Sequence, residues 1–337
     1  KLSEIQAEAI LELKLRHLAK LEEAKIQSEQ EELAAEKEKL ELLLSSDARL
    51  KTYIKKELKV VIENFGDERR SKIIAGVNTA QAFSEDDLVP AENVTVVLSD
   101  KGWVRSAKGH DIDPTTLNYK SGDNYLTSVQ GRSNKNAIFI DSTGRSYSLL
   151  ANSLPSARGQ GEPLTGRLSP PAGAEFVDAI MGDDTQHLLL ASDAGYGFIG
   201  TVNDLLSKKK AGKASLTLPG ESKVMKIVNV DDLEKQFVAV VTNRGRLLVF
   251  PVSDLPVLSK GKGNKLIQIP AKELKAREEF VVGICVLFET QNLKVYAGKR
   301  HLTIKFQDLT NYIGSRARRG NLLPKGYQGV DSIEAVE

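Results

Sequence analysis

Basic side chains gather with glycines in short loops between residues 156 and 321. The strongest clusters lie in SKKKAGKA (207–214), SKGKGNK (259–265) and SRARRGN (315–321), and SARGQGEP (156–163) is a weaker example. A glycine-containing loop exposes backbone N–H groups, and the lysine and arginine tips beside it add positive charge; both kinds of group bind phosphate. These residue types therefore predict contact with a polyanion rather than covalent catalysis.

The candidate phosphate-binding residues form two sets. The loop set comprises Lys120, Arg158, Arg167, Lys208, Lys209, Lys210, Lys213, Lys260, Lys262, Lys265, Arg316, Arg318 and Arg319. The second set, on or just after hairpin turns, comprises Arg105, Lys108, Arg145, Arg244 and Arg246, which either extend a track or only decorate strand edges. A single loop of this kind is usually a solvated basic turn, but several in register favour a curved track that bends duplex DNA through its phosphates.

Other chemistry has little support in the sequence. AGKAS (211–215) resembles the end of a nucleotide-binding P-loop, but Ser207 stands where that motif needs glycine. The four histidines are scattered without metal-ligand spacing, so no metal site is expected. The single cysteine, Cys285, lies in the apolar run FVVGICVLF and is expected to be a buried thiol. No catalytic residue is therefore expected in this stretch.

Hairpins must position the loops, and the sequence repeats one hairpin pattern. Two strand-like runs flank a short turn that ends in glycine in VTVVLSDKGWVRS, NAIFIDSTGRSYSL, HLLLASDAGYGFIG and FVAVVTNRGRLLVF. The turn glycines Gly102, Gly144, Gly195 and Gly245 follow one another at intervals of 42, 51 and 50 residues. The residue types of each turn suit a type I turn followed by a left-handed glycine.

A fifth hairpin, LKVYAGKRHLTIKF, turns near residues 299–301 and carries its glycine earlier, at Gly298. Repeats of about 50 residues built from short strands indicate propeller-like blades. The alternative is a β-sandwich whose hairpins share common turn chemistry. A polar glycine-bearing loop follows each turn, with NYKSGD (118–123) the least basic, and this recurrence favours the blades.

Residues 1–65 have the pattern of helices. Ser3 and Gln6 form a capping box. Apolar residues follow at mixed three and four spacing and then every seventh position, namely Ile5, Ile10, Leu11, Leu15, Leu18, Leu21, Ile26, Leu33 and Leu40. SSDA (45–48) breaks the helix, and a second helix, capped by Ser46 or Asp47, runs to Gly66.

Two interpretations of this segment stay open: a solvated helical hairpin, or a protruding antiparallel coiled coil that meets a partner subunit. Residues 66–93 are expected to form a polar linker with at most a short strand at Ile73–Val77, and residues 94–331 the β-rich domain. The expected fold class is an α-helical segment followed by an all-β domain.

The length and net charge of the chain limit its domain number and its partners less strictly than the motifs do. The 337 residues suffice for two or three domains, and 47 Lys and Arg against 45 Asp and Glu give a net charge of +2, so only the placement of charge can indicate a polyanionic partner. The longest apolar run, residues 280–288, is far shorter than the ~18 residues of a membrane helix. We expect a soluble protein of a reducing cytoplasm.

Longer motifs carry a resemblance to a known family. LSEIQAEAILELKLRHLAKLEE (2–23) and YIKKELKVVIENFGDERRSKI (53–73) resemble the end of the breakage–reunion region in A subunits of bacterial type IIA DNA topoisomerases. The β-rich motifs look specifically like the A subunit family of topoisomerase IV, namely VLSDKGWVRSAKGHDID (97–113), DSTGRSYSL (141–149), SARGQGEPLTG (156–166), ASDAGYGFIG (191–200) and FPVSDLPVLSKGKGNK (250–265).

The resemblance implies a five-bladed β-pinwheel, a propeller-like ring whose blades exchange strands, attached to a coiled-coil arm and dimerisation segment. It implies that the pinwheel binds double-stranded DNA on its rim and presents a transported segment for relaxation, decatenation and chromosome segregation. The implied partners are the B subunit of topoisomerase IV and a second copy of the A subunit. ATP and Mg are expected on the B subunit, with no cofactor bound by this stretch. The implied location is the bacterial cytoplasm, with the chromosome.

Two departures from the wider family limit which of its functions can be expected of this chain. Gyrase A subunits carry a box of the form QRRGGKG where this chain has NYKSGD, so gyrase-like DNA wrapping is the alternative and not the first expectation. The family's cleaving tyrosine follows an arginine, and none of the eight tyrosines here does, so this stretch alone is expected to cleave nothing. The alternative from another class is a protein-interaction propeller whose basic loops are merely solvated.

Overall fold

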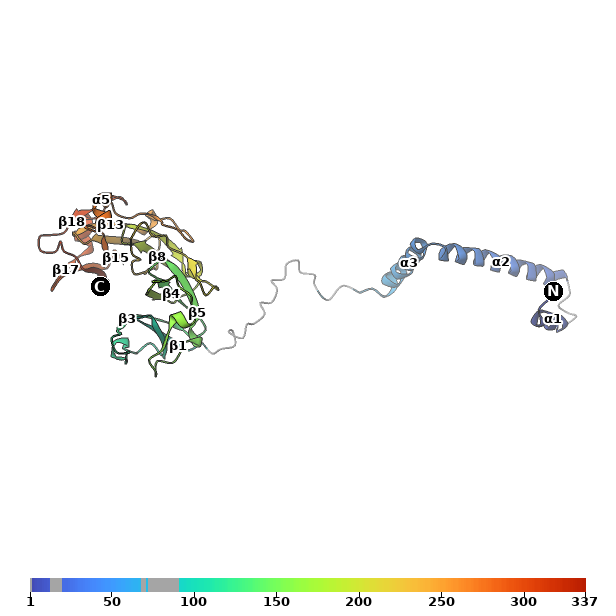
Figure 1. Ribbon diagram of the computed structural model, residues 1–337. Coiled ribbons are helices and arrows are strands. Elements are labelled where there is room, and N and C mark those ends of the chain that lie inside the picture. Colours follow the sequence, from blue (N-terminus) through green and yellow to red (C-terminus); the bar gives the residue numbers. More distant parts are fainter. Residues whose placement is uncertain (1, 13–19, 68–70, 72–90) are drawn as a thin grey trace. The chain divides into compact units, whose positions relative to one another are not determined.

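The computed structural model describes residues 2–12, 20–67, 71 and 91–337 (Figure 1). The chain divides into two compact units, one up to Gln81 and one from Ala82. Among the described residues, the first unit is helical and the second is built from sheets. The strand expected at Ile73–Val77 and the apolar positions Leu15 and Leu18 lie outside the described residues.

The helices of the first unit are α1 (Glu4–Leu11), α2 (Lys20–Leu44) and α3 (Asp47–Phe65). The capping box is confirmed, because the Ser3 hydroxyl accepts from the Gln6 N–H and the Gln6 side chain accepts from the Ser3 N–H. The predicted break after Leu44 and the end at Gly66 are also confirmed, although the Ser46 side chain makes no capping hydrogen bond.

Helices α2 and α3 contact each other, but they enclose no core. The heptad residues Ile26, Leu33 and Leu40 are 56%, 59% and 52% exposed, and no described side chain between residues 2 and 67 is buried. Among the described side chains of this unit, the apolar residues are therefore exposed or at most half-buried.

The second unit consists of five antiparallel sheets within residues 91–337, all of which are described. Sheet 1 has the order β3 (Tyr125–Arg132), β1 (Asn93–Ser99), β2 (Trp103–Lys108), β6 (Glu162–Pro163). Sheet 2 has the order β7 (Phe176–Ile180), β4 (Asn136–Asp141), β5 (Arg145–Leu150), β10 (Lys213–Ala214). Sheet 3 has the order β11 (Val228–Val230), β8 (His187–Ser192), β9 (Tyr196–Thr201), β14 (Asn264–Lys265).

Sheet 4 has the order β15 (Val281–Phe288), β12 (Gln236–Thr242), β13 (Arg246–Pro251), β18 (Asn321–Leu322). Sheet 5 has three strands in the order β19 (Ser332–Val336), β16 (Asn292–Ala297), β17 (Arg300–Ile304). Short helical turns connect these strands, namely α4 (Val202–Leu205), α5 (Ala271–Lys275), Pro114–Thr116, Ala151–Ser153, Leu164–Gly166, Val252–Asp254 and Phe306–Asn311. The last strand, β19, lies wholly after residue 331, where the sequence had suggested the domain would end.

Strand exchange joins successive sheets. The fourth strand of each of sheets 1 to 4 is a two-residue segment that arrives after the hairpin of the following sheet; for example, β6 follows the β4–β5 hairpin but pairs with β2. Sheet 5 has no such fourth strand. This arrangement confirms the expected pinwheel fold, and the β-sandwich alternative is wrong because the hairpins belong to five separate sheets.

The hydrophobic core lies between successive sheets. Alternate residues of one strand face opposite neighbours: Ala137 and Phe139 pack towards sheet 1, whereas Ile138 and Ile140 pack towards sheet 3. Further clusters fill the spaces between sheets 3 and 4 and between sheets 4 and 5. Because both faces are buried, β4, β8, β12 and β13 are mostly runs of apolar residues, whereas β2 (WVRSAK) and β5 (RSYSLL) keep polar residues between apolar ones.

The innermost strands of all five sheets line one central cavity of 440 Å³. They are β3, β7, β11, β15 and β19, each of which ends the order of its sheet. The exchanged strands β6, β10, β14 and β18 lie at the opposite, outer edges of their sheets. The loops that lead into the exchanged strands are therefore placed at the outer rim.

Candidate nucleic-acid interface

The repeated turn glycines build the outer edge in two ways. Gly102, Gly144, Gly195 and Gly245 have φ of 73°, 81°, 77° and 71°, which confirms the left-handed glycine predicted for each turn. Their carbonyl oxygens then accept from the N–H groups of Leu164, Leu216, Leu266 and Leu323, at 2.9, 2.9, 2.7 and 2.8 Å respectively. Each of these leucines follows an exchanged strand and is buried. The repeated turn is thus the docking point for the chain segment that arrives from the next hairpin.

The glycines of the basic loops have a packing role that the sequence interpretation missed. Gly161, Gly212, Gly263 and Gly320 all have positive φ, between 67° and 86°. A Cβ at Gly263 would lie 2.2 Å from the carbonyl oxygen of Gly197 on the adjacent strand, and the other three positions are similarly tight. These glycines let each loop pack closely against a neighbouring sheet. This packing accounts for glycine at these four positions without the expected contact between their backbone N–H groups and a phosphate.

Backbone hydrogen bonds connect each of the last three loops to the chain segment that follows the preceding loop. The N–H of Ser169, just past β6, donates to the carbonyl of Lys210 at 2.8 Å. Gly261 exchanges hydrogen bonds with Ser215 and Thr217, just past β10, at 3.0 and 2.9 Å. Arg318 accepts from Gln268, just past β14, at 2.9 Å. We call residues 156–163, 207–214, 259–265 and 315–321 the loop band, because they form one connected strip across the outer edges of sheets 1 to 4.

Part of the predicted set lies exposed on this band. The side chains of Arg158, Lys208, Lys209, Lys210, Lys260 and Arg318 are exposed and make no hydrogen bond or ion pair with another described residue. Lys120 and Lys262 are also exposed, with their ammonium groups over the rings of Trp103 and Tyr196. Lys265 is half-buried beside the same Tyr196 ring.

Lys108 lies next to the start of the band. It is exposed and pairs with Glu92 at 2.8 Å. Together with Arg158 it lines a 740 Å³ groove whose floor includes Val94, Ala107 and Leu154.

Arg105 is a correction to the predicted set. Its side chain is 3% exposed, donates to the carbonyls of Asn118 and Gly159 at 2.8 and 3.1 Å, and stacks over the Tyr119 ring at 4.5 Å. An arginine enclosed in this way holds two loops together and presents no charge to a phosphate.

Several other predicted contacts are engaged within the protein. Arg145 donates to the carbonyls of Ala211 and Gly212, Arg246 to that of Gly320, Arg316 to those of Asp254 and Lys265, and Lys213 to that of Asp204. Arg167 pairs with Glu162 at 2.5 Å. These side chains are only half-buried, but their hydrogen bonds fix the loop band rather than leaving the charge free.

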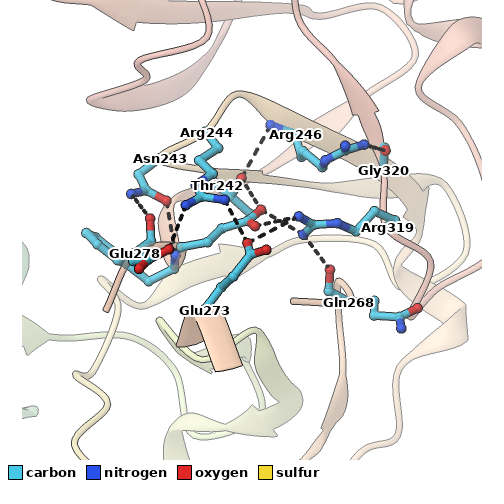
Figure 2. Close-up of polar contacts among 11 residues, drawn as sticks. Thr242, Asn243, Arg244, Arg246, Gln268, Glu273, Glu278, Arg319 and Gly320 are labelled. Carbon is cyan, nitrogen blue, oxygen red and sulfur yellow. Dashed lines mark hydrogen bonds and ion pairs between the residues drawn. The ribbon is translucent and has the colours of Figure 1, made fainter. Parts of the chain in front are cut away.

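Arg319 and Arg244 belong to a carboxylate network at the base of the last loop. Figure 2 shows Arg319 between Glu273 and the carbonyl of Gln268, while Arg244 pairs with Glu273 and Glu278 at 2.9 and 3.1 Å. Arg319 also makes two hydrogen bonds, of 2.7 and 2.5 Å, to the fully buried carboxylate of Glu279. Both arginines were predicted to bind DNA, and the structure gives both of them intramolecular partners.

The network controls the ionisation of Glu279. Burial alone would raise its pKa, but the hydrogen bonds from Arg319 and from the Thr242 hydroxyl, at 3.0 Å, hold the pKa below its ordinary value. The carboxylate therefore stays charged and fixes the hairpin turn of sheet 4 to the arriving loop.

The aromatic residues Trp103 and Tyr196 were missed from the sequence. Each directly follows a turn glycine, and each carries a lysine ammonium over its ring, at 3.4 Å for Lys120 and 4.4 Å for Lys262. Their position after the turn glycine was the signal that could have identified them, since arginine occupies the same place in sheets 2 and 4.

Other kinds of site find no support in the described part of the chain. It contains no group of three or more His, Cys, Asp or Glu side chains arranged to hold a metal ion. Among the described helices, none combines the length and apolar character needed to cross a membrane.

Comparison with known proteins agrees with this geometry. A family model described as the DNA gyrase C-terminal domain, a β-propeller, matches residues 186–231 and 236–284. The A subunit of DNA topoisomerase 4 from Pseudomonas aeruginosa is 55% identical over 98% of this chain, and that from Escherichia coli is 50% identical over 99%. The chain spans 44% of the length of each of these two relatives.

A solved structure extends the agreement to three dimensions. The Escherichia coli ParC C-terminal domain matches with a TM-score of 0.67 at 50% identity, over 72% of this chain and 98% of that one. Sequence and fold therefore agree, and the chain belongs to the family of DNA topoisomerase IV A subunits, with a β-pinwheel like that of the ParC C-terminal domain.

Proposed function

We propose that the β-pinwheel binds duplex DNA along the loop band, without sequence preference, and bends it. The observation that carries the proposal is the continuity of the band: exposed, unpaired cations lie on four loops, and backbone hydrogen bonds tie each of the last three loops to the segment that follows the preceding one. Positive charge spaced along a fixed, curved strip attracts the phosphate backbone and releases counterions, and the additional phosphate contacts that a bent duplex makes offset the cost of bending.

The role of this binding follows from the family. The pinwheel holds and presents a DNA segment to a topoisomerase IV that relaxes and decatenates DNA, and so supports chromosome segregation in the bacterial cytoplasm. In that enzyme this chain works with the B subunit, which supplies ATP and Mg chemistry, and with a second copy of the A subunit. This stretch, which has no tyrosine after an arginine, contributes DNA binding and no cleavage.

The scarcity of lysine and arginine in the loop between β2 and β3 favours this role over gyrase-like wrapping. The first loop of the pinwheel, NYKSGD (118–123), folds back on its own sheet, where Asn118 accepts from Arg105 and Asp123 accepts from the Ser99 hydroxyl at 2.7 Å. Only Lys120 of this loop presents a cation, so the first sheet lacks a strongly basic box.

The test is the binding of the full chain to a labelled duplex of random sequence across a salt series. Affinity should fall steeply between roughly 50 and 200 mM salt and should differ little between unrelated duplexes. Binding that is weak at low salt and insensitive to it would reject the proposal and favour a protein-interaction propeller, because an apolar peptide contact does not release counterions.

A further inference from the structure

The residue after each turn glycine lies beside the loop band in sheets 1 to 4. Trp103, Arg145, Tyr196 and Arg246 occupy this position and pair with Pro163, Ala214, Lys265 and Leu322 of the exchanged strands. The four side chains are half-buried at equivalent points of the register. What they do there can therefore be compared directly.

All four positions place positive charge at the outer edge, by two different routes. In sheets 2 and 4 the residue is itself an arginine that donates to loop carbonyls. In sheets 1 and 3 it is an aromatic residue with an ammonium over its ring, from Lys120 at 3.4 Å in sheet 1 and from Lys262 at 4.4 Å in sheet 3. Lys265 lies at 5.8 Å from the Tyr196 ring centre.

The two lysines reach their rings from different parts of the fold. Lys262 belongs to the loop that arrives from the following hairpin, whereas Lys120 belongs to the loop between β2 and β3 of sheet 1 itself. The loop that arrives at sheet 1, residues 156–163, contains no lysine. The same contact is thus made from two unrelated chain segments, which argues that the ring and the cation belong together.

We propose that Tyr196 and Trp103 are positioning residues for DNA binding, each holding a lysine ammonium at the outer rim in the orientation that meets a phosphate. The inference rests on the proposed function. A free lysine loses much rotamer freedom when it binds a phosphate, and a ring that already restricts it reduces that loss. The attraction between an ammonium and an aromatic face leaves the charge itself intact.

The experiment is a double-mutant cycle in the full chain. DNA affinity at low salt is measured for the unaltered chain, Tyr196→Leu, Lys262→Gln and the double variant, with Tyr196→Phe as the conservative replacement. We expect Tyr196→Leu to weaken binding about two- to fivefold and Tyr196→Phe to keep the original affinity, because phenylalanine retains the ring. Lys262→Gln should cost less affinity in the Tyr196→Leu background than alone.

A matched control separates the loss of the ring that positions Lys262 from the loss of an aromatic side chain elsewhere. Tyr53→Leu removes an exposed tyrosine of the helical unit and should leave DNA affinity unchanged. The pair Trp103→Leu and Lys120→Gln repeats the cycle in sheet 1, so the inference stays testable if Tyr196→Leu does not fold.

The possible outcomes are distinct. No binding by the unaltered chain would mean that the proposed function itself is wrong. Normal binding by the unaltered chain, together with equal or tighter binding by Tyr196→Leu, would overturn only the positioning role. An equal cost of Lys262→Gln in both backgrounds would overturn it too, because the ring would then act independently of the lysine.

Discussion

Arg319 reaches from the last loop of the band to the buried carboxylate of Glu279 and closes on it with two hydrogen bonds of 2.7 and 2.5 Å. Glu279 lies just before β15, whose sheet the loop completes. The pair therefore fixes the exchanged strand β18 to its sheet by a charged contact in addition to the backbone ladder.

Replacing Glu279 with glutamine should destabilise the pinwheel strongly. The variant leaves the Arg319 guanidinium half-buried against a neutral partner, and breaking a buried pair typically costs about 3–5 kcal/mol. Chemical denaturation of the variant and of the unaltered chain would measure this difference. Glu234→Gln, at an exposed carboxylate on a turn, is the control and should change stability by less than about 0.5 kcal/mol. Equal effects of the two variants would show that the Arg319 contact contributes nothing.

The same carboxylate should give the fold an acid-sensitive component. Because the folded pKa of Glu279 is below its ordinary value of 4.5, its contribution to stability is present above that value and is lost as the pH falls through the folded pKa. Unfolding free energies measured from neutral to acid pH should fall less steeply for Glu279→Gln than for the unaltered chain. Parallel curves would contradict the assignment.

Removing the three successive lysines of the second loop should weaken DNA binding without harming the fold. In Lys208→Ala, Lys209→Ala, Lys210→Ala, the affinity for all duplexes should fall similarly, and the salt slope should drop by roughly 2 to 3. The melting temperature should change little, because these side chains have no partner among the described residues. Binding at several salt concentrations and a melting curve would check both points.

The control for that variant removes the same charge from another place. Lys51, Lys55 and Lys59 are exposed on α3, and their replacement by alanine lowers the net charge equally. A similar loss of affinity in this control would mean that overall charge, and not the loop band, determines DNA binding.

Gly263 should be far less tolerant of a side chain than Gly109. Both have positive φ, 73° and 83°, but a Cβ at Gly263 meets backbone at 2.2 Å, whereas at Gly109 it meets nothing within 4 Å. Gly109→Ala should cost only the backbone strain, about 1 kcal/mol, and Gly263→Ala should cost clearly more because sheet 3 must also move away from the loop. Thermal unfolding of the two variants would compare them, and equal midpoints would be inconsistent with close packing of the loop.

Cys285 should be unreactive in the folded chain. Burial raises the pKa of its thiol to about 12, so almost no thiolate exists near neutral pH. A thiol reagent at pH 8 should modify it only after denaturant is added. Rapid modification without denaturant would show that β15 opens towards the central cavity, which Cys285 lines.

The hairpins could be predicted because each leaves a local mark. A polar turn that ends in glycine lies between two apolar runs, so the five or six residues around Gly195 are enough to predict its left-handed conformation. The irregular fifth turn was visible for the same reason, since its glycine is displaced to Gly298. Strand exchange left no such mark, because a two-residue strand such as Glu162–Pro163 has no periodicity, and only the family resemblance indicated it.

The roles of individual arginines could not be predicted, because they depend on distant backbone. Arg145 meets carbonyls 66 and 67 residues further along the chain, and Arg246 meets one 74 residues away. A loop buries Arg105, and the amino-acid composition of that loop does not show where the loop runs. The exposed lysines 208–210 could be predicted because three successive charges cannot all be buried.

The exchanged strands of sheets 1 to 4 give the pinwheel a direction of assembly. Each earlier sheet is completed by a segment that lies 58 to 76 residues downstream of its pairing partners, so its edge is filled only once the next repeat has been made. Within residues 91–337, the final repeat, with its displaced turn glycine at Gly298, receives no exchanged strand. During synthesis the sheet of each blade should consequently be completed only when the following repeat has been made. A chain halted after any repeat would expose one unpaired strand edge of the kind that promotes aggregation.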